Sequence, residues 1–163
     1  MKDSRDYFIQ TLEDEIPRFI RVLKAVPNKN LDYRPHPRSK SAGELLQLFT
    51  GEPEEFVIIS ETGFLDFAKH KRSGLPLDRA ILVNFFKKNM SCIINAVKNL
   101  SDSDWMSEAR MVNDSEEFWK TTRQDMVWGL LLDLIHHRGQ LSTYIRPMGG
   151  KVPSIYGSSG DSK

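Results

Sequence analysis

The sequence predicts an all-α protein, an up-and-down four-helix bundle. Four long segments repeat apolar side chains at steps of three and four residues, the spacing that places them on one face of a helix. Polar segments with proline and glycine separate them, and we find no convincing strand pair. A helix with one apolar face must bury that face against another element, so four such helices predict a bundle.

The first two predicted helices both contain a proline. The first spans residues 4–26, where Pro17 is expected to kink the helix because it lacks a backbone donor. The second begins at Ser41, which forms the S-x-x-E capping box with Glu44, and Pro53 is expected to bend or break it. The apolar stripes are Phe8, Leu12, Ile16, Phe19, Leu23 and Val26 in the first helix, and Leu45, Leu48, Phe49, Phe56 and Ile59 in the second.

The third and fourth helices are predicted over residues 78–100 and 122–146. Thr122 and Asp125 form a similar capping pattern at the start of the fourth helix, and Pro147 and Gly149 end it. The stripes are Leu82, Phe86, Met90, Ile93, Val97 and Leu100 in the third helix, and Met126, Leu130, Leu134, Leu141 and Ile145 in the fourth.

The connections are predicted to be loops, over residues 27–40, 63–76 and 101–121, with a short helix at 102–106. Residues 1–150 then form the bundle, and residues 151–163 form a C-terminal tail that is expected to be partly flexible.

Composition narrows the choice of function class. The chain has 163 residues with 23 basic and 22 acidic side chains, and this balance argues against a nucleic-acid partner. No apolar run approaches the roughly 20 residues of a membrane span, so no membrane is expected. Cys92 is the single cysteine, so no intrachain disulfide can form, which fits a cytoplasmic protein.

The candidate functional side chains lie in the stretch from Asp133 to Gln140. Asp133 and His137 lie four residues apart and therefore project from the same face of the fourth helix, which we expect to point towards the core. A carboxylate and an imidazole at this spacing suit a divalent metal site between helices. The alternative is a buried Asp–His pair whose two groups form a hydrogen bond with each other and have no further role. His136 is rotated by about 100° on the helix and faces elsewhere, and Arg138 is expected to pair with an acid on a neighbouring helix.

The segment from Leu130 to Ser142, with its continuation from Tyr144 to Gly157, resembles the C-terminal helix and tail of the DinB-like family. Residues 34–37 and 41–46 resemble that family's entry into its second helix. The resemblance implies a DinB-like four-helix bundle, often a homodimer, with a divalent metal (Zn, Ni or Mn) between helices. It also implies thiol transfer, isomerisation or metal-dependent hydrolysis of an unknown small-molecule substrate or thiol.

The sequence departs from the family pattern at two ligand positions. The family places one histidine on the second helix and two histidines four residues apart on the last. Here Leu48 stands at the expected second-helix position, and Asp133 stands where His137 should have its histidine partner. Aspartate can bind a metal, but leucine cannot. Glu52 lies one turn beyond Leu48 and is the candidate third ligand, whereas Gln47 points elsewhere on the helix.

Three hypotheses remain open from the sequence. The first is a metal-dependent hydrolase or thiol transferase with an altered site built on Asp133 and His137. The second is a non-catalytic, metal-free bundle that binds a small molecule or a partner, as Leu48 at a ligand position suggests. The third is a mainly structural dimer. The sequence therefore leaves enzymatic activity uncertain.

Overall fold

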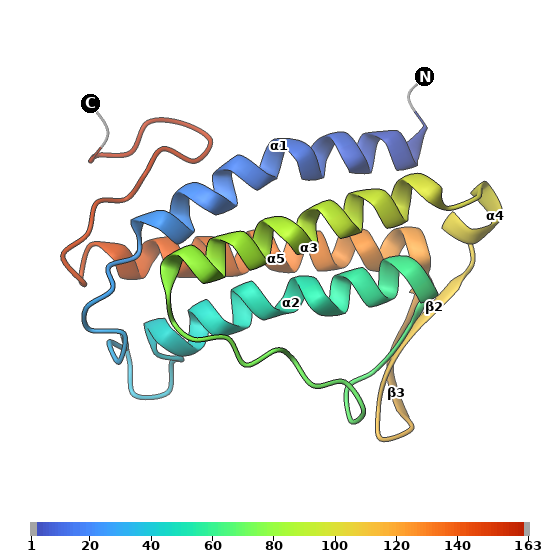
Figure 1. Cartoon of the computed structure of the whole chain (residues 1–163), viewed down its shortest axis with the longest axis horizontal. Coiled ribbons are helices and arrows are strands. Elements are labelled where there is room, and N and C mark those ends of the chain that lie inside the picture. Colours follow the sequence, from blue (N-terminus) through green and yellow to red (C-terminus); the bar gives the residue numbers. More distant parts are fainter. Residues whose placement is uncertain (1–2, 162–163) are drawn as a thin grey trace.

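Four long helices run side by side in the computed structural model, which describes residues 3–161 (Figure 1). Within these residues they are α1 (Ser4–Ala25), α2 (Ala42–Thr62), α3 (Arg79–Asn99) and α5 (Arg123–Ile145), and a short helix, α4, spans Asp102–Trp105. All five helices lie where the sequence predicts them. None of the described helices is long and apolar enough to cross a membrane.

Side-chain caps determine where these helices begin. Ser41 accepts a hydrogen bond from the amide of Glu44, and the Glu44 carboxylate accepts one from the amide of Ser41, so the predicted capping box is present. Thr122 caps α5 by accepting from the amide of Asp125. α2 continues through Pro53, so of the expected bend or break the break is wrong, and α1 also continues through Pro17.

A small sheet corrects the prediction of a purely helical fold. β1 (Phe64–Asp66) pairs in parallel with β2 (Glu108–Asn113), which forms an antiparallel hairpin with β3 (Glu116–Thr122). The sheet lies at the end of the bundle where α2 ends and α5 begins (Figure 1). The hairpin turn is Asp114–Ser115, and both residues have positive φ, as a two-residue turn of this type requires. The turn lacks the glycine that usually marks such hairpins, so this loop was wrongly predicted to be free of strands.

The apolar stripes meet in one core. Its centre is aromatic: Phe19 lies edge-on to Phe49 and Phe86, and Phe8 lies edge-on to Phe56. All five rings are fully or almost fully buried. Rings at these centroid separations of 5.6 to 6.1 Å interlock α1, α2 and α3.

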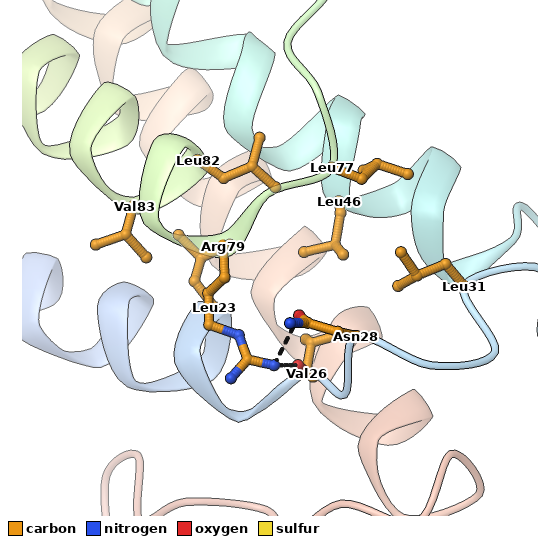
Figure 2. Close-up of a pocket in the computed structure, with 9 residues that line it drawn as sticks. All are labelled: Leu23, Val26, Asn28, Leu31, Leu46, Leu77, Arg79, Leu82 and Val83. Atoms are coloured by element: carbon orange, nitrogen blue, oxygen red, sulfur yellow. Dashed lines mark hydrogen bonds between the residues drawn. The ribbon is translucent and has the colours of Figure 1, made fainter.

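The end of the bundle opposite the sheet is tightly filled. Figure 2 shows leucine and valine side chains from α1, α2 and α3 converging there, while Arg79 reaches across to Val26 and Asn28. The space left among them is only about 10 Å³, about the volume needed for one water molecule. This small space is therefore part of the core rather than a binding site.

A buried ion pair joins α1 to α5. The guanidinium of Arg138 contacts the carboxylate of Glu15, and both side chains are almost fully buried. Arg18 also pairs with Glu15, at 3.0 Å, and the rings of Phe19 and Tyr156 lie against the Arg138 guanidinium. The expectation that Arg138 pairs with an acid on a neighbouring helix is confirmed.

The described part of the tail, residues 151–161, is held against α1 and α5. Arg138 donates to the hydroxyl of Tyr156 at 2.8 Å, and Arg21 donates to the carbonyl of Ser154 at 2.9 Å. Arg146 pairs with Asp161 at 2.8 Å. Through Tyr156 the tail covers the buried ion pair. Residues 1, 2, 162 and 163 of the predicted segments lie outside the described residues.

Alanine substitutions at two glycines of α5 should change the free energy of unfolding in opposite directions. A β-carbon at Gly129 would lie 2.4 Å from the Trp119 ring, whereas one at Gly139 would meet nothing within 4 Å. We expect Gly129→Ala to lower the free energy of unfolding by about 1–3 kcal/mol through overpacking. Gly139→Ala should raise it by up to about 1 kcal/mol through helix propensity. Urea unfolding measures both, and equal effects would contradict the packing described.

Arg138→Met should destabilise the fold by about 3 kcal/mol, because it leaves Glu15 buried without its main partner. The control Arg146→Met breaks a more exposed pair and should cost less than about 1 kcal/mol. The double variant Glu15→Met/Arg138→Met should recover much of the loss, since two apolar side chains need no partners. Thermal unfolding of the three variants checks this, and similar melting temperatures for both single variants would refute it.

Candidate metal centre

Three side chains with metal-binding atoms come together between α2 and α5. They are Glu52 on α2 and Asp133 and His137 on α5, and one ligand atom from each lies within 4.8 Å of the other two. Nε2 of His137 is 3.0 Å from Oε1 of Glu52 and 3.6 Å from Oδ2 of Asp133. The expected juxtaposition of Asp133 and His137 is present, and Glu52, the candidate third residue, joins them.

The three side chains differ in burial. Glu52 and His137 keep only 11% and 14% of their side-chain surface, whereas Asp133 keeps 54%. The expectation that Asp133 faces the core is therefore wrong, because this face of α5 lies at the rim of the α2–α5 contact. The cluster consequently has a buried side, formed by Glu52, and an open side, formed by Asp133.

Gln140 sets the orientation of the imidazole. Its side-chain oxygen lies 2.8 Å from Nδ1 of His137, three residues earlier on the same helix. With Oε1 as the acceptor, Nδ1 carries the proton and the lone pair of Nε2 points at the two carboxyl groups. A histidine that binds a metal is usually held in this way, by a hydrogen bond from its other ring nitrogen. Gln140 was not among the predicted site residues, although its spacing of three residues from His137 places both on the same helix face.

Glu52 is the most perturbed carboxyl group of the cluster. Burial is the main cause that raises its pKa to about 8, and the negative charge of Asp133 contributes to that rise. At neutral pH the carboxyl group of Glu52 therefore keeps its proton and can donate it to Nε2 of His137. Its second oxygen, Oε2, is buried and has no hydrogen-bond partner among the described residues. Leaving such an atom without a partner is costly, so this oxygen marks a place where a ligand fits.

The cluster meets the chemical requirements of a small divalent cation. Two carboxylate oxygens and one imidazole nitrogen suit Zn²⁺, Mn²⁺ and similar ions. Ligand atoms about 2.0–2.2 Å from one ion lie at most ~4.4 Å apart. The distances of 3.0 and 3.6 Å from Nε2 of His137 to Glu52 and Asp133 lie within this limit.

The other residues considered from the sequence lie outside the cluster. Leu48 is half-buried one turn before Glu52, and Gln47 is exposed. His136 is exposed beside His137, with ring centroids 5.3 Å apart. The site has thus no ligand at the position of Leu48, and Glu52 supplies a carboxylate one helical turn further along.

Two hollows open beside the cluster. One, of about 220 Å³, includes His137 and Gln140 in its wall, and we call it the His137 hollow. The other, of about 330 Å³, lies over α2 beside Leu48 and Gly51, and we call it the α2 hollow. The walls of the His137 hollow are Ser39, Lys40, Leu45, His137, Gln140, Thr143 and Tyr144. A small molecule in this hollow would lie directly against His137.

The raised pKa of Glu52 predicts that this residue contributes less to the stability of the fold as the pH rises. Its pKa rises from 4.5 to about 8 on folding, so its contribution to stability is largest below pH 4.5 and is lost as the pH rises to about 8. Glu52→Gln removes this titration. In the presence of a chelator, we expect the variant to gain in melting temperature over the native protein as the pH increases from 5 to 8.5.

The exposed Glu61 of α2 provides the control, since Glu61→Gln should leave the pH profile of the melting temperature unchanged. If the profiles of Glu52→Gln and the native protein run parallel between pH 5 and 8.5, burial of Glu52 does not raise its pKa.

Comparisons with known proteins agree on one family. The model of the DinB family matches residues 89–161. A DinB-like protein from Bacillus subtilis has the same fold with a TM-score of 0.71 and 17% identity, covering 93% of this chain and 99% of that one. A DinB-like protein from Bacillus cereus ATCC 10987 gives a TM-score of 0.69 and 19% identity, covering 91% and 95%. No curated protein matches the sequence. The C-terminal part of this chain is thus similar in sequence to the DinB family, and the chain shares the fold of the two DinB-like proteins.

Proposed function

We propose that this protein binds a divalent metal ion through Glu52, Asp133 and His137, and uses it in a hydrolytic or thiol-transfer reaction on a small molecule. The observation that carries the proposal is the buried Oε2 of Glu52, which lacks a hydrogen-bond partner among the described residues and lies in a cluster with two other metal-binding groups. A cation at this point would satisfy that oxygen and separate the charges of the two carboxylates.

The charges of the cluster favour a divalent ion. Two ionised carboxylates balance a charge of +2, and a neutral imidazole adds a ligand without adding charge. The raised pKa of Glu52 is a property of the metal-free protein, and a bound cation would favour the ionised form. Three protein ligands leave coordination positions for water or substrate, as in catalytic metal sites.

The roles of the residues follow from their positions. Gln140 holds the His137 ring in place, Glu52 closes the buried side, and Asp133 lies at the open side. When bound, such an ion lowers the pKa of a coordinated water or thiol, which makes it a nucleophile at neutral pH. The His137 hollow offers space for the small molecule that this nucleophile would attack.

A metal-free binding protein is the second candidate. The contact between Nε2 of His137 and Glu52, at 3.0 Å, partly satisfies both groups without any metal. Leu48 contributes an apolar wall to the α2 hollow where the family pattern has a ligand. In this alternative, the hollows would bind a small molecule or a partner without catalysis.

Metal analysis decides between the candidates. We expect the untagged native protein, after incubation with Zn²⁺, Ni²⁺ or Mn²⁺ and desalting, to retain close to one ion per chain by elemental mass spectrometry. The variant Asp133→Ala/His137→Ala should lose at least about 90% of this metal, because a single remaining carboxylate binds weakly.

The control variant Glu61→Gln/His136→Ala changes an exposed acid and an exposed histidine outside the cluster and should retain the metal. Absence of metal from the native protein under all three conditions would refute the metal site and favour the metal-free candidate.

A further inference from the structure

Lys40 is shared by both hollows. The residue lines the His137 hollow and also the α2 hollow. It is exposed, and its amino group makes no ion pair with any described residue. The other cations near these hollows are engaged: Arg72 forms two hydrogen bonds with Glu55, and Arg34 pairs with Glu44 at 2.8 Å.

The backbone around Lys40 is held in place. The hydroxyl of Tyr144 donates to the carbonyl of Lys40 at 3.1 Å, which ties this segment to α5 at a residue four positions after Gln140. On either side, Arg34 donates to the carbonyl of Ser39 and the amide of Ser41 donates to Glu44, both at 2.7 Å. Because its backbone is held in place, the amino group of Lys40 stays in one region of the surface, even though its long side chain has several rotatable bonds.

When a divalent cation balances the two carboxylates of the cluster, Lys40 carries the one unpaired charge among the described residues in the wall of the His137 hollow. Apart from Lys40 and His137, the described walls of that hollow carry no ionisable group except the Tyr144 hydroxyl, which bonds to Lys40. Glu44 borders the α2 hollow, but its pKa is lowered to about 2 because Arg34 and the Ser41 amide bind its carboxylate. A divalent ion would balance Glu52 and Asp133, leaving the positive charge of Lys40.

We propose that Lys40 binds an anionic group, such as a carboxylate, on the small molecule that occupies the His137 hollow. The inference rests on the proposed metal site, because without a cation the exposed carboxylate of Asp133 would oppose an anionic molecule. Ser39 and Thr143 are polar residues in the wall of the same hollow. At about 220 Å³ the hollow is smaller than the roughly 300–1,000 Å³ that drug-sized ligands occupy, so the substrate is small.

Hydroxamates test this directly, because they chelate divalent metals whatever the natural reaction. The protein is loaded with Co²⁺, whose visible absorption reports ligand binding. Monohydroxamates of malonate, succinate and glutarate are compared with neutral analogues in which a methyl group replaces the free carboxylate. For at least one chain length, we expect the native protein to bind the carboxylate compound about three- to fivefold more tightly.

Lys40→Gln should abolish that preference while leaving binding of Co²⁺ and of the neutral analogues unchanged. Lys29→Gln, an exposed lysine outside both hollows, should behave like the native protein. The preference should also shrink as salt rises from 0.02 to about 0.5 M, because salt screens exposed charges.

The outcomes separate the two proposals. If Co²⁺ gives no protein-bound absorption that depends on Asp133 and His137, the metal site fails, and the role of Lys40 fails with it. If Co²⁺ and hydroxamates bind but no chain length shows a preference that Lys40→Gln removes, only the role of Lys40 is overturned.

Discussion

The buried contact between Arg138 and Glu15 fixes how α5 is rotated in the bundle. Successive residues of a helix point about 100° apart, so a helix whose Arg138 faces α1 must turn His137 towards another neighbour, and that neighbour is α2. The ion pair is costly to bury and needs its full set of contacts. Arg18, Phe19 and the tail residue Tyr156 supply them, and the position of the cluster on α2 and α5 follows from this arrangement.

The helices were predictable because their signals are local. Ser41, Asp78 and Thr122 each cap the helix that starts at the next residue, and each lies within a few residues of the apolar stripe that it begins. The sheet was not predictable for the opposite reason. β2 is short, it has a bulge near Met111, and its turn at Asp114–Ser115 has no glycine to reveal positive φ. Its partner β1 is distant in the sequence, so their parallel pairing has no local signal.

The candidate site was predictable in part. The spacing of Asp133 and His137 on one helix places them together whatever the tertiary structure. The position of Glu52 depends on how α2 packs against α5 and on whether the helix continues through Pro53. Neither can be predicted from a local sequence pattern. The burial of Asp133 was misjudged because its helix face was inferred from apolar neighbours. In the structure, that face runs from the core at Met126 to the rim at Asp133.

The cluster joins the second helix of the bundle to the last. An ion held by groups of both helices is a cross-link between parts of the chain that meet only when the bundle is complete. Binding energy of this kind adds to the stability of the assembled state alone, since neither helix by itself offers the full set of ligands. A cation bound as proposed would therefore make the attachment of α5 to α2 depend on the supply of metal.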